Sequence, residues 1–267
     1  MKNIFLTGAS SGIGLSIAKA LVARGDEVWG TSRQPGRMAQ MARLHPVGLD
    51  LRDASSIDSA FARALSDAGY FDVVINNAGS GHFGPAEYLS AQEIGDEFQT
   101  LVFGHLQLMR LALPTMRARG EGLIINVTSL ASRLPVPFMA AYNAAKSAMA
   151  AFTMSIQLEL PDSKVRIVDL EPGDISTAFN DAVTRSSPGD PQYEAKLSKT
   201  WEAIDRNMKA APKPDLVAQH VLKLIDATNP APRLTVGDSF QTKIAPFIFR
   251  FLPQRLRIWG LKKYYGI

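Results

Sequence analysis

An α/β fold, with helices on both faces of a parallel sheet, is predicted for this chain by three observations. Short apolar segments alternate with longer helical patterns along the sequence, without an internal repeat. The short segments are apolar almost throughout, as strands buried on both faces are. A glycine-rich turn joins the first of them to the first helical pattern. We therefore expect a single Rossmann-type, doubly wound domain at 1–237, with a lid at about 174–213 and a basic amphipathic C-terminal tail at 238–267.

The predicted elements alternate in the N-terminal half. In order, they are a strand at Lys2–Leu6, a helix at Ile13–Arg24, strands from Glu27 and Pro46, a helix after Asp53, a strand from Asp72 and a helix opened by SAQE at Ser90–Glu93. SAQE is a capping box, in which a serine and a glutamate each accept a hydrogen bond from the other's backbone amide.

The C-terminal half continues the alternation. In order, it predicts a long helix from about Phe98 towards Met116, a strand from Gly122, a helix at Tyr142–Leu160, and strands from Lys164 and Arg233. The stretch from Gly173 to about Pro214 is loop-like at both ends. A long segment of this kind more often covers a substrate than simply connects two elements.

The positive charge lies in the tail. Residues 238–267 hold six lysines and arginines against Asp238 alone, so the rest of the chain carries −1 of the net +4 and shows no stripe for nucleic acid. Four apolar residues of the tail have helical spacing: Ile244, Phe247, Ile248 and Phe251. Two interpretations are open: the tail lies on an anionic membrane, or it packs on the body or on a second subunit.

Several classes of protein are excluded by composition. The chain has no cysteine, which rules out disulfides, thiol catalysis and zinc–thiolate sites, and we predict no metal site. The amino terminus runs straight into a strand, so we expect no signal peptide. Because no apolar run is long enough to span a bilayer, we expect a cytoplasmic protein, with membrane association left to the tail.

The glycine-rich turn, TGASSGIG at Thr7–Gly14, predicts a phosphate site. Gly8 permits a tight turn, Gly12 lets the backbone approach a pyrophosphate, and Gly14 allows close packing of helix on strand. The amino terminus of the following helix offers free amides to that anion. The alternative is a glycine turn without a ligand.

YNAAK at Tyr142–Lys146 suggests proton transfer. Residues four apart share a helix face, so the lysine charge can act on the phenol. Free tyrosine has a pKa of about 10, and a nearby lysine cation and an oxidised nicotinamide, if one binds here, both favour the phenolate and lower that pKa. The pair by itself equally fits a solvated helix face.

These motifs, taken together, resemble the short-chain dehydrogenase/reductase family. The similarity covers Met1 to about Val236 and rests on five motifs in the family's order: TGxxxGxG at Thr7–Gly14, NNAG at Asn76–Gly79, the serine of INVTS at Ser129, YxxxK at Tyr142–Lys146, and PG…T at Pro172, Gly173 and Thr177. The stretches NNAGSGHFGPAE and EPGDISTAF look most like the hydroxysteroid and retinol dehydrogenase branch.

The resemblance implies a reaction and its residues. Tyr142 would be the acid/base, Lys146 would lower its pKa and hold the nicotinamide ribose, and Ser129, otherwise a common strand-end serine, would hydrogen-bond the reacting oxygen. The implied cofactor contacts are Gly8, Ser10, Ser11, Gly12, Ile13, Gly14, Ser32, Arg33, Asp50, Leu51, Asn77, Ala78, Gly79, Tyr142, Lys146, Pro172, Gly173 and Thr177.

The end of the second strand favours NADP(H) over NAD. An acidic residue there would bind the ribose of NAD, but WGTSR offers Ser32 and Arg33, and a guanidinium suits a 2′-phosphate. The alternative for Arg33 is a solvated surface residue. Asp50 matches the family position that contacts adenine, while Asp53 is the better helix cap.

One position departs from the family pattern. Leu101 stands where the family has an asparagine that holds a water for proton relay, and leucine cannot hydrogen-bond. We expect a rerouted relay with activity retained; the alternative is a non-catalytic nucleotide-binding sensor or scaffold. His82 is a candidate for the pocket wall, and His105 for local packing on a helix face.

Substrate and partners follow from the resemblance and the lid. A bulky apolar carbonyl or alcohol substrate is expected from Phe179, Tyr193, Trp201 and Met208, which could equally be core. The family implies a homodimer or homotetramer, built on the helices near Phe98 and Ala148.

Overall fold

The predicted doubly wound fold is confirmed by the computed structural model, which describes residues 1–161, 163–187 and 189–267. A seven-stranded sheet has the order β3-β2-β1-β4-β6-β7-β9, and every neighbouring pair is parallel. Its strands are β1 (Asn3–Leu6), β2 (Glu27–Ser32), β3 (Leu44–Gly48), β4 (Val73–Asn76), β6 (Glu121–Val127), β7 (Lys164–Pro172) and β9 (Arg233–Val236). The strand order reverses between β1 and β4, where such folds bind ligands.

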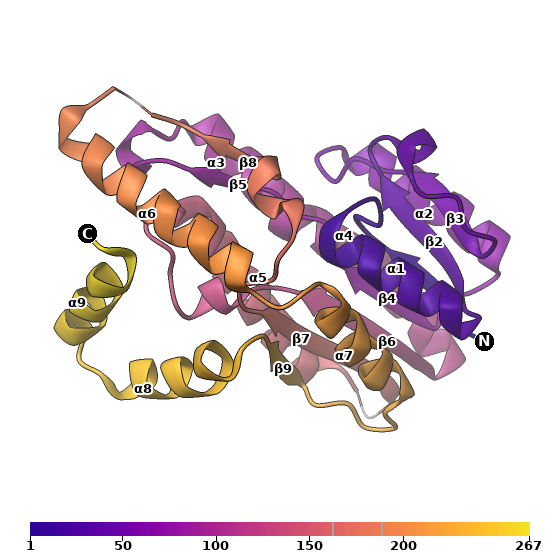
Figure 1. Ribbon diagram of the computed structural model, residues 1–267. Coiled ribbons are helices and arrows are strands. Elements are labelled where there is room, and N and C mark those ends of the chain that lie inside the picture. The colour runs from indigo at the N-terminus through magenta and orange to yellow at the C-terminus, as the bar shows by residue number, and fades with distance from the viewer. Residues whose placement is uncertain (162, 188) are drawn as a thin grey trace.

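Helices cover both faces of this sheet (Figure 1). Alternate residues of β1 point to opposite faces, so Ile4 and Leu6 join one core and Phe5 the other. The first core is completed by α1 (Gly12–Arg24) and α7 (Asp215–Asp226), and the second by α2 (Ala54–Ala68), α4 (Gly104–Arg119) and α5 (Ala140–Glu159). The strands are buried on both sides, which explains their continuous apolar sequences.

Helix starts follow the predicted capping residues. Asp53 accepts a hydrogen bond from the amide of Ser55 and caps α2. Ser90 and Glu93 form the capping box that opens α3 (Ala91–Phe98). Both predictions are confirmed, because capping depends on residues within one turn of each other.

A π-helical segment was not predicted. Gln99–Phe103 joins α3 to α4 as a π-helix, within the stretch that the sequence indicated as one regular helix. The wider turn buries Leu101 and Val102. Such bulges occur frequently at functional sites.

Residues 174–213 are more regular than the sequence indicated. They contain a 3₁₀ turn (Ala178–Ala182), the strand β8 (Val183–Arg185), which pairs with β5 (Gly81–Phe83), and the helix α6 (Pro191–Ala210). Trp201 of α6 meets the ring of Phe83 edge to face, with 5.0 Å between ring centroids. The segment is therefore joined to the body by a strand pair and an apolar cluster.

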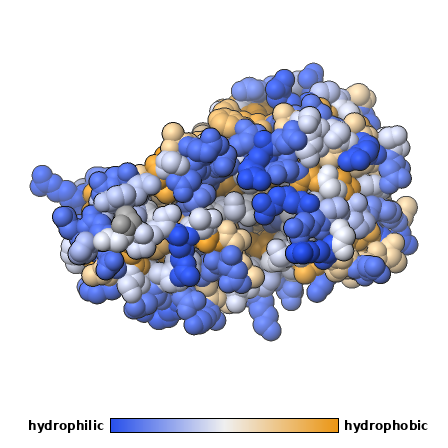
Figure 2. Space-filling view, turned by 90° about the horizontal axis from the view of Figure 1, so that it is seen from above, coloured by the Kyte–Doolittle hydropathy of each residue, from blue (hydrophilic) through white to orange (hydrophobic). Residues whose placement is uncertain are grey.

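The tail has two unlike helices. After a π-helical turn at Phe240–Ile244, α8 (Ala245–Phe251) lies apart from the body and α9 (Gln254–Tyr265) returns to pack against α6 (Figure 1). Phe247 and Phe251 of α8 are 67% and 69% exposed. Across the described ranges, no helix combines the length and apolarity needed to cross a bilayer. On the face turned towards the viewer in Figure 2, hydrophilic residues predominate and apolar ones show in patches between them.

Candidate active site

A cavity of about 1010 Å³ opens at the carboxyl ends of the central strands. The structure places every residue of the predicted site along its wall: Gly8, Ser10, Ser11, Gly12, Ile13, Gly14, Ser32, Arg33, Asp50, Leu51, Asn77, Ala78, Gly79, Ser129, Tyr142, Lys146, Pro172, Gly173 and Thr177. Their placement is a structural observation, whereas the role of each remains a prediction. Among the described residues, no group of His, Cys, Asp and Glu side chains is arranged to hold a metal ion.

The glycine turn has the geometry that a pyrophosphate needs. Gly8 and Gly12 have φ of 70° and 53°, in the left-handed region that favours glycine. A Cβ on Gly14 would lie 2.0 Å from the carbonyl oxygen of Gly8. The side chain of Ser11 makes no capping bond at the start of α1, so the amides of the first turn remain available to an anion.

Thr7 stabilises this turn through hydrogen bonds to the residues that follow β4. Its hydroxyl oxygen accepts hydrogen bonds from the amides of Asn77, at 2.8 Å, and Ala78, at 3.0 Å. The Asn77 side chain donates in return to the carbonyl of Thr7 at 2.9 Å. His105 is buried with Nε2 3.3 Å from the Thr7 hydroxyl, which confirms local packing for that histidine. These contacts fix the end of β4 against the turn.

Two guanidinium groups stand at the opposite end of the cavity. Arg33 is exposed at the end of β2. Arg52, which the sequence analysis did not single out, pairs with Asp50 across 3.1 Å. That hydrogen-bonded ion pair lowers the pKa of Asp50, and Arg33 adds a smaller effect in the same direction.

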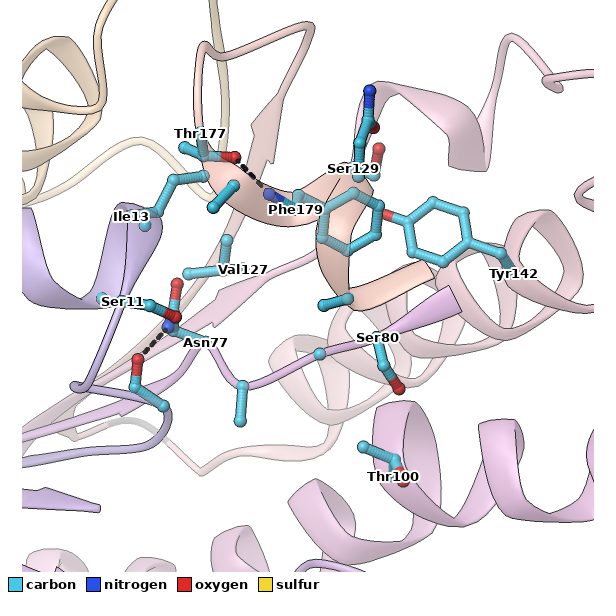
Figure 3. A pocket seen from close by; sticks show the side chains of 18 of the residues that line it. Ser11, Ile13, Asn77, Ser80, Thr100, Val127, Ser129, Tyr142, Thr177 and Phe179 are labelled. Carbon is cyan, nitrogen blue, oxygen red and sulfur yellow. Dashed lines mark hydrogen bonds between the residues drawn. The ribbon is translucent and has the colours of Figure 1, made fainter. Parts of the chain in front are cut away.

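Ser129, Tyr142 and Lys146 meet at the inner end. Tyr142 points from α5 towards Phe179, with Ser129 beside it (Figure 3). Ser129 follows β6, its hydroxyl oxygen accepts a hydrogen bond from the amide of Ala131 at 3.1 Å, and its side chain lowers the pKa of the phenol. Lys146, one turn further along α5, donates to the carbonyl of Val127 at 2.8 Å, and its ammonium is 5.8 Å from the centre of the Tyr142 ring.

In the protein without cofactor the pKa of Tyr142 lies above that of free tyrosine, while the lowering expected with the oxidised nicotinamide bound stays a prediction. Burial raises the pKa of Tyr142 to about 12, against a smaller opposite effect from the Ser129 hydrogen bond, and the charges of Glu97 and Asp174 raise it further. Burial also lowers the pKa of Lys146 to about 8. The sequence argument considered the lysine charge but not the two carboxyl groups or the low dielectric.

Glu97 is a site residue that sequence reasoning missed. It lies on α3, only 2% exposed, and lines the cavity together with His82. Burial raises the pKa of Glu97 to about 7. A capping box just before an ordinary amphipathic turn gives no signal that the next glutamate points inward, so this role depends on the tertiary fold.

Leu101 fills the position of the absent asparagine with apolar contacts. It is 1% exposed and packs with Val102, Ala145 and Tyr142. A Cβ on Gly79 would come within 3.1 Å of its side chain. Because leucine has no polar side-chain atom, this position offers no hydrogen bond towards Lys146.

The outer wall joins residues far apart in sequence. The Phe179 ring lies 5.7 Å from that of Tyr142, and Met208 also lines the cavity. Tyr193 and Trp201 instead pack in the cluster that holds the segment to the body. Three further lining residues were not predicted: Asp174, Asn207 and Tyr265.

The fold and cavity define a class of protein. A parallel sheet with a glycine-lined anion site next to a serine, a tyrosine and a lysine is the arrangement of a dinucleotide-dependent oxidoreductase. The chain belongs to the short-chain dehydrogenase family, because residues 2–187 match the family model described as short chain dehydrogenase.

Relatives and solved structures agree with this assignment. The chain is 28% identical to the 3-ketodihydrosphingosine reductase of Bacteroides thetaiotaomicron over 99% of this chain and 98% of that protein. A short-chain dehydrogenase from Streptomyces avermitilis has a TM-score of 0.85 at 29% identity, covering 97% and 96% of the two chains. The 3-ketoacyl-(acyl-carrier-protein) reductase of Brucella melitensis, complexed with NADH, has a TM-score of 0.74 at 26% identity, covering 88% and 96%.

The chain is therefore an enzyme of the alcohol dehydrogenase and ketoreductase type. The non-catalytic alternative raised by Leu101 is not favoured by these matches. The place of this chain in the hydroxysteroid and retinol dehydrogenase branch stays a prediction.

Proposed function

We propose that this enzyme interconverts a lipophilic ketone and its secondary alcohol with NADP(H), using Tyr142 as proton donor and acceptor. The observation that carries the proposal is the meeting of Ser129, Tyr142 and Lys146 at one end of a cavity whose middle is the glycine turn. Aldehydes and primary alcohols fit the same chemistry.

The reaction assigns one task to each side chain. The bound cofactor supplies the hydride. The phenol of Tyr142 gives its proton to the carbonyl oxygen, and the Ser129 hydroxyl donates a hydrogen bond that stabilises the charge developing there. The Lys146 ammonium places a positive charge on the side of α5 that lines the proposed cofactor site. A pKa of about 12 keeps Tyr142 protonated at neutral pH, the form that reduction requires.

The proposed preference for NADP(H) rests on the charge near the adenosine end. Arg33 is exposed on the cavity rim, next to Ser32 and close enough to Asp50 to lower its pKa. No carboxylate ends β2, so nothing there repels a 2′-phosphate. The Brucella reductase is complexed with NADH, so the fold alone does not select NADP(H), and we infer that the preference depends on this rim.

The substrate proposal rests on the outer wall. Val136, Met139, Phe179, Ile204 and Met208 supply an apolar surface beside Tyr142. The relative aligned along nearly its full length is named 3-ketodihydrosphingosine reductase. A ketone with a long aliphatic or fused alicyclic body fits this wall.

Tyr142→Phe tests the function. NADPH oxidation is followed with an aliphatic methyl ketone, a decalone and a long-chain β-keto ester. The variant should lose at least about a thousandfold in kcat, because it keeps the ring but not the proton. Its NADPH affinity, measured by cofactor fluorescence, should stay within about threefold. Full activity of the variant would sink the proposal.

A homodimer or homotetramer fits the outer face of α4 and α5. Phe103, Phe152, Met154 and Leu158 are exposed there, and Leu158 is 81% exposed. An apolar set of this kind on neighbouring helices is typical of a subunit contact. Light scattering should give a multiple of 29.0 kDa, and Leu158→Lys with Met154→Lys should shift it towards the monomer.

The tail is proposed to contact anionic lipid. Phe247, Phe251 and Trp259 are exposed on α8 and α9, and among the described residues the six tail cations form no ion pair with a carboxylate. Aromatic residues interleaved with cations suit a lipid headgroup region. Phe247→Ser with Phe251→Ser should abolish co-sedimentation with phosphatidylserine vesicles; unchanged binding would contradict the proposal, and altered mass in light scattering would indicate a subunit contact instead.

A further inference from the structure

Glu97 has a buried oxygen that the proposed chemistry does not use. Among the described residues its Oε2 has no hydrogen-bond partner. Burying an unpaired carboxyl oxygen costs on the order of 1–3 kcal/mol. The side chain nevertheless lines the cavity at the penultimate residue of α3.

The position of Glu97 is defined by two residues of β5. The amide of His82 donates to its Oε1 at 3.3 Å, and His82 Nδ1 lies 3.5 Å from Oε2. A Cβ built on Gly81 would be 3.6 Å from Glu97 Oε1 and 3.5 Å from Cδ2 of Tyr142. Gly81 thus lies within van der Waals reach of both the carboxyl group and the phenol ring.

Glu97 and Lys146 are coupled through their charges. The lysine lowers the pKa of Glu97, which burial raises to about 7, and the glutamate raises the pKa of Lys146, which burial lowers to about 8. Each shift brings the pKa of its group closer to neutrality, so both groups can exchange protons in the pH range in which the enzyme would work. The other titratable groups that face this pair include Asp169, which raises the pKa of Lys146 more than Glu97 does, Tyr142, His82, Glu93 beyond His82, and His105, whose pKa burial lowers to about 3.

The carboxyl group lies one helical turn before Leu101. Glu97 lies at the end of α3 where the π-helical segment begins, and Leu101 within that segment packs against Tyr142 without offering a polar atom. His82 is partly exposed and completes a path from the carboxyl group to solvent.

We propose that Glu97 is the proton-relay residue of this enzyme, acting through Lys146 in place of the absent amide at Leu101. This proposal rests on the proposed carbonyl reduction. In each reductive turnover the carbonyl oxygen takes the phenol proton of Tyr142. The phenolate regains a proton from the Lys146 ammonium, and the resulting amine takes one from the Glu97 carboxylic acid, with water filling the gaps. The carboxylate is reprotonated from solvent by way of His82, so one solvent proton is consumed per hydride transferred.

Glu97→Gln tests the relay, because glutamine keeps the shape but does not titrate. With NADPH and a decalone between pH 6 and 9, kcat should fall about tenfold to a hundredfold, below the effect of direct acid–base catalysis. NADPH affinity should not change. Added imidazole should restore part of the rate, and Leu101→Asn should restore it in the Glu97→Gln background. Glu159→Gln, at the exposed end of α5, is the matched control and should leave kcat unchanged.

The outcomes separate this proposal from the proposed function. If Glu97→Gln keeps kcat within twofold across the pH range while Tyr142→Phe is inactive, the relay is wrong and the function stands. If Tyr142→Phe is also active, the function itself fails. Should Glu97→Gln not fold, His82→Gln is measured in the same way, and a rate that is neither reduced nor responsive to imidazole overturns the relay.

Discussion

The glycine turn and the outer wall of the cavity are held in place in different ways. At the glycine turn, Thr7, Asn77 and Ala78 connect through backbone groups, the Thr7 hydroxyl and the Asn77 side-chain amide, with distances of 2.8 to 3.0 Å. All of them lie on β1, β4 or the residues directly after these strands. The turn is therefore specified by the sheet itself, which any family member can provide.

The outer end depends on side chains from remote elements. Gln241 reaches Asp174 across the cavity edge and also donates to the Tyr264 hydroxyl at 3.3 Å. Asn207 of α6 donates to the same hydroxyl at 2.9 Å. The C-terminal tail thus supports the wall through which a substrate would enter. The comparison suggests that cofactor binding is set by the strand ends, and substrate choice by the tail and α6.

The largest expected effect comes from a substitution in the glycine turn. Gly14→Ala would place a Cβ 2.0 Å from a backbone carbonyl, which cannot move without disturbing Gly8. We expect NADPH affinity to fall at least about a hundredfold, or the apoprotein to lose several kcal/mol of stability, since overpacking against backbone costs 1–3 kcal/mol or more. Cofactor fluorescence titration and thermal unfolding measure the two.

Gly95→Ala is the matched control for that substitution. Gly95 lies inside α3 with nothing within 4 Å of its added Cβ. Alanine should stabilise the helix by about 0.5–1 kcal/mol. Equal behaviour of the two variants would contradict the argument from the glycine turn.

The second prediction concerns Glu97 and pH. Its pKa is about 7 when folded, against 4.5 for the free side chain, so the folded state binds more protons between these values. Stability contributed by this group therefore falls as pH rises through that window. Glu97→Gln removes the cost of ionising this buried carboxyl group at high pH. The free energy of unfolding of the variant minus that of the parent should therefore rise from pH 4 to pH 8, by at most about 3 kcal/mol. Urea unfolding at both pH values measures this, and a constant difference would contradict it.

The same contrast explains what the sequence could predict. Glycine spacing, the caps at Asp53 and Ser90, and the four-residue offset of Tyr142 and Lys146 are local, and each was placed correctly. The inward direction of Glu97 was not predictable, because it depends on how α3 packs on β5 and α5. Only the fold buries the phenol and brings carboxyl groups near it, which is why the raised pKa of Tyr142 in the cofactor-free protein could not be predicted from the sequence.

The C-terminal tail shows most clearly what could not be predicted from the sequence. Helical spacing predicted its helices, yet nothing local indicated that Tyr265 would line the cavity while Phe247 stayed exposed. Similarly, α6 was missed because its apolar residues, among them Leu197 and Trp201, are few and its remaining surface is polar.

The third prediction tests whether Arg33 selects the cofactor. Arg33→Ala should raise KM for NADPH about tenfold and leave KM for NADH within about twofold, since a guanidinium–phosphate pair on a partly solvated rim is worth 1–2 kcal/mol. Arg37→Ala, an exposed neighbour in the next turn, serves as the control. A parallel change for both cofactors would show that Arg33 does not read the 2′-phosphate.

The smallest expected effect lies at the outer end. Tyr264→Phe removes the hydroxyl that accepts from Asn207 and Gln241 but keeps the ring, which meets Tyr265 edge to face at 5.0 Å. Each lost hydrogen bond on this half-exposed wall is worth about 0.5–1.5 kcal/mol, and water can replace part of it. We expect KM for a decalone to rise about threefold, with kcat and NADPH affinity unchanged, because no contact of Tyr264 reaches the glycine turn. A weaker affinity for NADPH instead would mean that the two ends are coupled, and that the tail also supports the cofactor.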